Sequence, residues 1–174
     1  MTAPACTIRF AGPSDVPTIF GLIKALAEYE RLSHEVAGTE EQLREHLFGE
    51  RRFAEVFLAE VDGRTVGFAL FFHNYSTFLA RPGIYLEDLF VLPEERGRGY
   101  GKALLSCLAR IAVERGCGRL EWSVLDWNEP SINFYKALGA VAMDEWTVYR
   151  VTGDALTRLG TSGPEVIPSD PKAI

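Results

Sequence analysis

The chain has 174 residues, which is enough for one ordinary domain and too few for two. Hydrophobic residues make up 47% of it and charged residues 24%, a balance that is typical of globular proteins and excludes global disorder. Its net charge is -6 and it has no basic cluster, so a nucleic-acid partner is excluded and a cationic ligand is favoured.

Hydrophobic periodicity predicts the elements of the first half of the chain. Ser14 can cap a helix whose apolar residues recur every three or four positions. Thr39 begins a capping box with Gln42 and so predicts a second helix. Asp62-Gly63, between two apolar segments, predicts a hairpin turn. In order, the sequence predicts a strand at 7–11, helices at 14–31 and 40–48, strands at 53–61 and 65–73, a loop at 74–83 and a buried strand at 84–92.

Helices and strands alternate in the second half. A glycine-rich segment at 96–101 precedes a helix that runs to about Arg115 and stops at Gly116. Further elements are predicted as a strand at 119–125, a helix at 128–138 and strands at 140–143 and 146–151. This order predicts a single mixed α/β (α+β) domain over residues 1–160 with an antiparallel centre of the sheet. Residues 161–174 are rich in Gly, Pro, Ser and Thr, which predicts a loose tail.

Several residue types argue against other classes of protein. No apolar run approaches the ~20 residues of a membrane helix, and the first residues lack the pattern of a secretory signal. The odd number of cysteines, Cys6, Cys107 and Cys117, indicates reduced thiols and a cytoplasmic protein. The three histidines are scattered without the spacing of a metal site, so no metal is expected.

The glycine-rich segment Arg96-Gly97-Arg98-Gly99-Tyr100-Gly101 lies between a buried strand and an amphipathic helix. Glycines let the backbone approach a ligand closely, and the N–H groups at a helix N-terminus favour an anion such as a phosphate. A Walker A loop is excluded, because arginine stands where its first glycine belongs and Ala103 follows Lys102. Phosphate binding and a flexible surface turn are equally compatible with this segment alone.

Three more segments accompany this Arg-x-x-Gly-x-Gly pattern: Leu22–Glu30, Tyr85–Val91 and Leu125–Lys136. Together they resemble the GNAT superfamily of N-acetyltransferases, and within it the diamine (spermidine/spermine-type) and thialysine acetyltransferases, from about residue 8 to residue 151. The resemblance implies a central, mostly antiparallel twisted sheet with splayed fourth and fifth strands, flanked by helices. It also implies acetyl-CoA as the cosubstrate, no metal, and a homodimer.

The same resemblance assigns residues to the cofactor. The backbone of Leu89, Phe90 and Val91 is expected to pair with the pantetheine arm in the gap between the splayed strands. The pyrophosphate is expected on the loop formed by Arg96, Gly97, Arg98, Gly99, Tyr100, Gly101 and Lys102. Contacts from the other side are expected from Asn128, Pro130 and Ser131.

Acetyl transfer to an amine needs a base and an acid. An alkylammonium with a pKa of about 10.4 must lose a proton before it attacks, and the leaving thiolate is helped by a proton donor. Periodicity alone favours a core tyrosine at Tyr135, but the resemblance reverses this and makes Tyr135 the expected general acid. Glu87 is the expected base, acting through water, because a carboxylate in an apolar strand is costly unless it is functional or paired with an arginine.

The amine is expected near Tyr29, Glu30, Glu87, Asp88 and Asp144, where carboxylates would balance its charge. For the end of the first helix, a solvated surface is the alternative. Strand alternation predicts Glu87 and Asp88 on opposite sides of the sheet.

The preferred amine is predicted to be small. The segment 74–78 lacks the acidic residue of polyamine-specific relatives, which favours thialysine or a short diamine over spermine. A protein lysine or N-terminus as acceptor, and a non-catalytic acetyl-CoA-binding module, remain alternatives.

Overall fold

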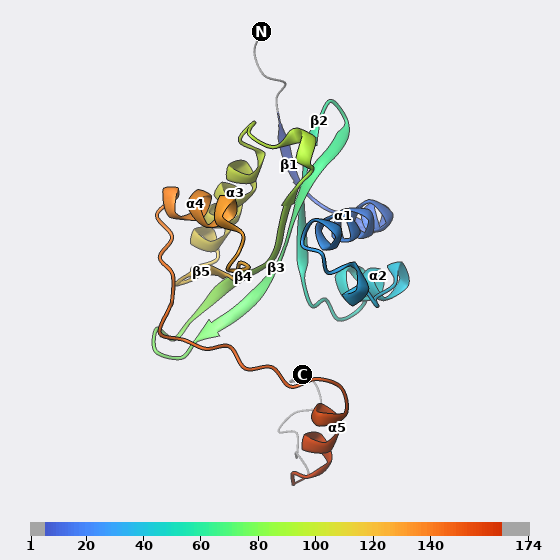
Figure 1. Ribbon diagram of the computed structural model, residues 1–174, viewed down its shortest axis with the longest axis vertical. Coiled ribbons are helices and arrows are strands. Elements are labelled where there is room, and N and C mark those ends of the chain that lie inside the picture. The colour runs from blue at the N-terminus through green and yellow to red at the C-terminus, as the bar shows by residue number, and fades with distance from the viewer. Residues whose placement is uncertain (1–5, 165–174) are drawn as a thin grey trace. The chain divides into compact units, whose positions relative to one another are not determined.

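The computed structural model describes residues 6–164, and the chain divides into two compact units, Met1–Leu125 and Asp126–Ile174. Figure 1 shows the course of the chain through both. The first unit contains β1 (Thr7–Phe10), α1 (Val16–Tyr29), α2 (Glu40–Phe48), β2 (Glu55–Val61), β3 (Arg64–Ser76), β4 (Arg81–Val91), α3 (Tyr100–Glu114) and β5 (Leu120–Trp122), with short 3-10 helices at Pro13–Asp15, Ser33–Glu35 and Pro93–Glu95. The second unit contains α4 (Glu129–Ala137) and α5 (Gly153–Thr161).

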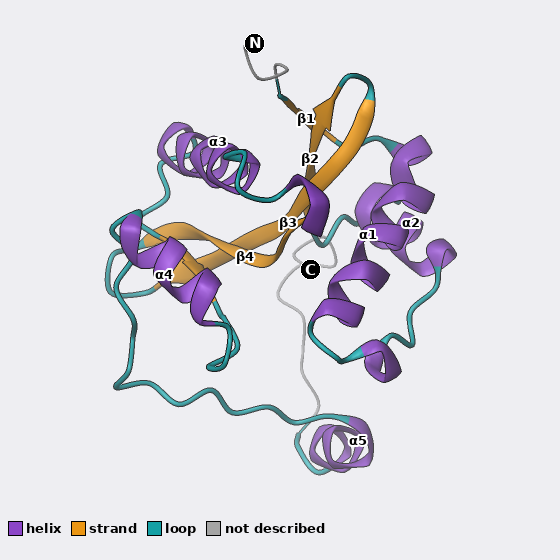
Figure 2. Cartoon of the chain, turned by 45° about the horizontal axis from the view of Figure 1, so that its top comes forward, coloured by secondary structure: helices purple, strands orange, loops and turns teal. Residues whose placement is uncertain are grey.

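The first unit is built on a five-stranded sheet in the order β1-β2-β3-β4-β5. Neighbouring strands are antiparallel except β4 and β5, which are parallel. Helices α1 and α2 lie on one face of the sheet and α3 lies on the other (Figure 2). The sheet of the predicted fold is therefore confirmed as mixed, with an antiparallel centre.

The apolar stripe of α1 forms the main core with α2 and the sheet. Ile19, Leu22 and Leu26 recur at helical spacing and are buried against the strands. α2 begins where the sequence predicts, because the Thr39 side chain accepts the Gln42 N–H and the Gln42 side chain accepts the Thr39 N–H. The rest of this cluster comprises Leu47, Val56, Leu58, Phe68 and Phe90.

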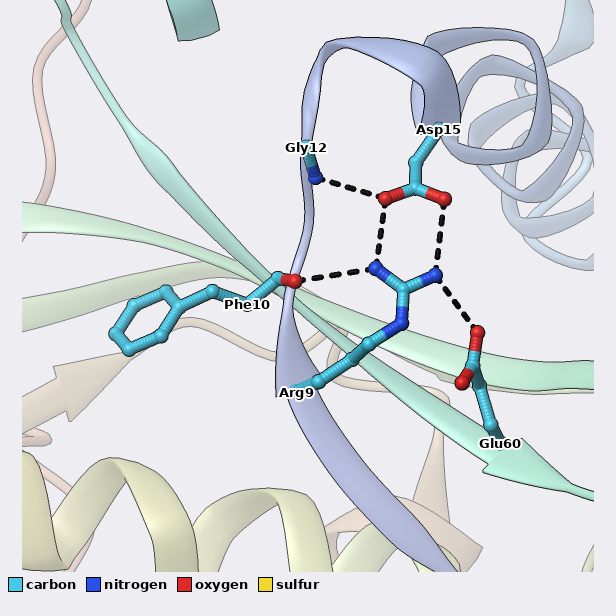
Figure 3. A network of polar contacts seen from close by, with 5 residues as sticks. All are labelled: Arg9, Phe10, Gly12, Asp15 and Glu60. Carbon is cyan, nitrogen blue, oxygen red and sulfur yellow. Dashed lines mark hydrogen bonds and ion pairs between the residues drawn. The ribbon is translucent and has the colours of Figure 1, made fainter.

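A charged network holds the N-terminal end of α1 (Figure 3). Arg9 of β1 donates to both carboxylate oxygens of Asp15, at 2.7 and 2.9 Å, and to Glu60 of β2 at 2.7 Å. Asp15 also accepts the Gly12 N–H at 2.7 Å. These charge-assisted bonds join β1, β2 and the entry to α1, and the Arg9 guanidinium holds the pKa of Asp15 below its ordinary value.

One irregularity interrupts the β3–β4 ladder. Leu70 lies opposite Asp88, and the next residue, Phe71, lies opposite Leu86. Glu87 is therefore the extra residue of a β-bulge, which bends the strand and redirects the side chains on either side of it. On its other edge, β4 pairs with β5 only from Ile84 to Leu86. β5 itself ends at Trp122, opposite Leu86, so the pairing stops before the bulge, and the splayed arrangement of the two strands stays a prediction.

The structure differs from the predicted elements in two places. Residues 74–83 were expected to form a loop, but β3 and β4 extend through most of this stretch and leave only 77–80 as a turn. Continuous cross-strand pairing outweighs the polar composition there.

The second difference is in the second unit. The strands predicted at 140–143 and 146–151 are wrong, since its described residues contain no strand, and the helix α5 was missed. A strand needs a partner for its backbone N–H and C=O groups, and β-propensity alone does not supply one. Of the expected loose tail, residues 165–174 lie outside the described part of the chain, and the single domain over 1–160 stays a prediction.

Candidate active site

The glycine-rich loop has the backbone of an anion site. Gly97 and Gly99 have φ values of 76° and 87°, in the left-handed region that favours glycine. Gly99 is the N-cap of α3, so the N–H groups of the first helical turn have no acceptor inside the helix. Left-handed residues followed by helical ones form a concave set of N–H donors, which binds phosphate well. This geometry favours the binding reading of the loop over a plain surface turn.

The side chains of this loop have different environments. Arg98 is exposed, and its Nη1 lies 3.1 Å from Oε2 of Glu95, a carboxylate that also pairs with Arg64. Tyr100 is only 4% exposed and packs inward as the first residue of α3, so the backbone is the part of it that a ligand on the surface can reach. Glu95 was not anticipated from the sequence. The signal that could have identified it is an acidic residue three positions before Arg98.

Arg96 is directed away from the exposed face of the loop. Its Nε donates to the Val91 carbonyl at 3.0 Å, and its guanidinium carbon lies 4.2 Å from the centre of the Tyr29 ring. The Phe90 ring is 5.5 Å away. The first residue of the loop thus contacts β4 and α1, two elements that also carry predicted site residues.

The backbone of β4 beyond the bulge offers hydrogen-bonding groups along one edge. Leu89, Phe90 and Val91 pair with β3 on one side, whereas the pairing with β5 has already ended at Leu86. A ligand arm that carries amide groups fits such an edge as an added strand does. Together with the loop, this edge fits the pantetheine and pyrophosphate of acetyl-CoA.

Three carboxylates gather where α1 ends beside the bulge. Burial, and then the charges of Glu87 and Glu30, raise the pKa of Asp88 to about 6. Burial also raises the pKa of Glu30. The bulge interrupts the regular alternation from which the separation of Glu87 and Asp88 was predicted, and Glu87 is exposed whereas Asp88 is half-buried. The charge of Glu87 still reaches Asp88, as the raised pKa of Asp88 indicates. Like charges held together in this way are typical of sites that receive a cation.

A cavity of about 500 Å³ opens beside this cluster. It lies between α1, α2 and the connection that joins them, and Glu30 and Asp88 line it. Its other walls are largely apolar, with Phe20, Ile23, Leu26, Val36 and Leu43 among the lining residues. Apolar walls with three carboxylates, the third from Glu35, suit a ligand that joins an aliphatic chain to an amine. The walls come from residues 20–46, and the fold brings Asp88 to them from a distant part of the chain.

The second unit carries the other predicted site residues. Asn128 caps α4, since its side chain accepts the Ser131 N–H at 3.3 Å, and Pro130 lies in the first turn of that helix. Tyr135 lies one turn further, with its ring centre 5.3 Å from that of Phe134. Asp144 is exposed in a turn after the helix. The predicted base and acid therefore belong to different units, Glu87 to the first and Tyr135 to the second.

Residues 6–164 contain no group of three or more His, Cys, Asp or Glu side chains that could hold a metal ion. Within the same residues, every helix is too short or too polar to cross a bilayer.

Comparison with known proteins identifies the family. The model of the acetyltransferase (GNAT) family matches residues 23–140. The chain is 39% identical to the thialysine N-epsilon-acetyltransferase of Mus musculus, over 87% of this chain and 95% of that protein. It is 38% identical to the L-ornithine N5-acetyltransferase NATA1 of Arabidopsis thaliana, over 86% of this chain and 85% of that protein.

A solved structure agrees with this result. An integron cassette protein from the mobile metagenome of V. cholerae matches with a TM-score of 0.76 and 27% identity, over 91% of this chain and 99% of that one. Its likeness extends the agreement from sequence to fold. The resemblance drawn from four short segments is thereby confirmed, and the chain belongs to the GNAT family of acetyltransferases.

Proposed function

We propose that this protein transfers the acetyl group of acetyl-CoA to a primary amine of a small molecule such as thialysine, ornithine or a short diamine. The observation that carries the proposal is the apolar cavity lined by Glu30 and Asp88, next to Glu87 on the bulge. It combines the shape for an aliphatic chain with the charge for an ammonium group. The names of the similar plant and mouse enzymes support the same class of substrate.

Acetyl-CoA is the cosubstrate that the family implies, and the first unit has groups that suit each part of it. The N–H groups from Gly97 to Lys102 would hold the pyrophosphate, with the exposed Arg98 and Lys102 adding positive charge. The open edge of Leu89–Val91 would pair with the pantetheine amides. In the second unit, Asn128, Pro130 and Ser131 are the expected additional contacts.

Glu87 and Tyr135 have the proton-transfer roles in this proposal. Glu87 accepts a proton from the bound ammonium through a water molecule, which frees the nitrogen lone pair. The nitrogen then forms a bond to the acetyl carbon as the carbon–sulfur bond breaks, and Tyr135 gives its proton to the departing sulfur. The second proton that the nitrogen loses on becoming an amide restores the Tyr135 hydroxyl through water. Glu30 and Asp88 stabilise the cationic substrate before the reaction. The bulge supports the role of Glu87, because it leaves that side chain exposed between neighbours that are buried or half-buried.

The size of the substrate follows from the charge near the β3–β4 turn. Asn74 donates to Glu121 at 2.7 Å, and the rest of 74–78 supplies no carboxylate for a distal ammonium of a long polyamine. Tyr75 and Phe78 are exposed there instead. A short diamine or diamino acid is therefore the better match.

The test is the release of free CoA from acetyl-CoA across a panel of acceptors. The panel contains thialysine, ornithine, lysine, putrescine, spermidine, spermine and a short peptide. We expect saturable release with at least one short amine, at a higher kcat/KM than with spermine. Highest turnover with spermine would overturn the substrate class. Turnover with the peptide alone would show a protein acceptor, and acetyl-CoA binding without release for any acceptor would show a binding module.

The assembly and location of the protein remain predictions. We expect a homodimer, which light scattering after gel filtration would show as twice the mass of the 19.3 kDa chain. We also expect the protein in the cytoplasm, which fractionation of cells that express it would show.

A further inference from the structure

Arg96 joins three segments that the proposed reaction uses. Its own backbone begins the glycine-rich loop, its Nε donates to Val91 of β4 at 3.0 Å, and its guanidinium lies over the Tyr29 ring of α1 at 4.2 Å. A planar guanidinium can donate at its edge and stack on its face at once, which a lysine ammonium cannot do. One side chain thereby connects the cofactor loop, the cofactor edge and the amine-binding helix.

The backbone N–H groups that suit a phosphate lie further along the loop. The N–H of Arg96 already donates to the Pro93 carbonyl at 3.3 Å, its Nε donates to Val91, and the face of its exposed guanidinium lies over Tyr29. The donors available to an anion are the N–H groups after the left-handed Gly97, together with the exposed Arg98 and Lys102. Arg96 is therefore placed to transmit the position of the loop to α1.

The contact falls on the last residue of α1. α1 ends at Tyr29 in a capped turn, in which Arg31 has a left-handed φ of 62° and the Leu32 N–H donates to the Ala27 carbonyl at 2.7 Å. Because these bonds hold the end of the helix together, a contact on the Tyr29 ring acts on Glu30 as well. Glu30, which lines the amine cavity, immediately follows the ring that Arg96 covers.

Resting on the proposed function, we propose that Arg96 is a positioning residue that couples acetyl-CoA binding on the loop to amine binding at Glu30, through its stack on Tyr29. Binding of the cofactor restrains the loop and thereby Arg96, and Arg96 in turn restrains the end of α1. The amine then binds to Glu30 after the cofactor has already ordered it. The two ligands therefore bind with positive cooperativity.

The first test measures the thialysine Kd by calorimetry, with and without saturating CoA, which binds but cannot donate an acetyl group. In the wild-type protein we expect CoA to tighten thialysine binding at least about five-fold, the lower end of typical coupling between sites. In Arg96→Lys we expect this factor to fall below about two, because the charge remains but the planar stack is lost. Tyr29→Leu should lower the factor equally, and the double variant should lower it no further.

Two conservative variants serve as controls. Tyr29→Phe keeps the ring under the guanidinium, so it should keep the wild-type coupling factor. Arg115→Lys makes the same change at an arginine that pairs with Glu55 at 2.5 and 2.8 Å, and it should also keep the factor. A full coupling factor in Arg96→Lys, or additive losses in the double variant, would overturn the proposal. A large loss of CoA affinity with the coupling intact would make Arg96 a phosphate ligand instead.

A second readout does not depend on the amine. Hydrogen exchange of the segment 24–32 should slow when CoA binds to the wild-type protein. In Arg96→Lys and Tyr29→Leu this protection should disappear while that of 97–104 persists. If no amine binds or is acetylated, the proposed function fails, and this exchange measurement alone then decides the role of Arg96. Protection of 24–32 that persists in Arg96→Lys would refute that role.

Discussion

The two ends of α1 hold their charges in opposite ways. At the N-terminal end, Arg9 is bonded to Asp15 and Glu60, so each charge faces a partner and the pKa of Asp15 is lowered. At the C-terminal end, Glu30 shares one environment with Asp88 and Glu87, and the pKa values of Glu30 and Asp88 are raised. Paired charges stabilise the fold, whereas like charges beside a cavity are typical of a site that binds a cation. The comparison therefore assigns a structural role to one end of the helix, and the proposed function gives the other end its role in binding the amine.

The largest effect that would test this division is expected at Glu87. Glu87→Gln should lower kcat at least about 100-fold, because a general base contributes that much or more, while the melting temperature stays the same. Tyr135→Phe should lower kcat similarly while acetyl-CoA binding is retained. Steady-state kinetics and calorimetric binding of CoA measure both. Unchanged turnover in either variant would remove that residue from the mechanism.

The next effect concerns the pH dependence of stability at Asp88. Its folded pKa of about 6 lies above the ordinary value of 3.8, so folding favours the protonated form. Its stabilising contribution is full below about pH 4 and is lost as the pH rises through 6. Asp88→Asn should therefore raise the free energy of unfolding by about 2 kcal/mol at pH 8, with little change at pH 4.

Calorimetric melting between pH 4 and pH 8 measures this difference. Asp62→Asn is the control, since Asp62 lies in the β2–β3 turn with a φ of 50° that asparagine also tolerates. If Asp88→Asn raised the free energy of unfolding by the same amount at every pH, then burial of the Asp88 charge and its repulsion by other carboxylates would not be the cause.

The smallest effect is expected from a matched pair of substitutions at the two ends. Arg9→Gln should destabilise the protein by about 1 kcal/mol, because its network is partly exposed, and should leave kcat/KM within about two-fold. A fall of about 3 °C in melting temperature corresponds to that loss. Glu30→Gln should do the reverse, raising the KM for thialysine about ten-fold without loss of stability. Equal effects of both variants on KM would erase the distinction between the ends.

Local patterns predicted the helices from α1 to α4, because the causes of those helices lie within a few residues. The capping box at Thr39 and the Asn128 cap of α4 are examples. The bulge at Glu87 escaped prediction, since alternation assumes a regular register and a bulge depends on the partner strand. The stack of Arg96 on Tyr29 joins residues far apart in the chain, so no local pattern could show it.

The second unit shows that residue preference alone does not produce a strand. Val141, Trp146 and Tyr149 have the composition of strands, yet Val141 is 83% exposed and Tyr149 is 91% exposed. Strand formation there would require a neighbouring backbone, which residue preference alone cannot provide.

Because of the bulge, the number of residues in β4 matters as well as their identity. Because β3 supplies one residue fewer than β4 across this stretch, the count of residues decides which side chains face which layer. Deleting Leu86 would restore an even ladder and retain both acids, while it changes the register of the residues around them. In β4, the proposed site therefore depends on the number of residues as well as on their types. A deletion that conserves every acidic residue could still abolish the site.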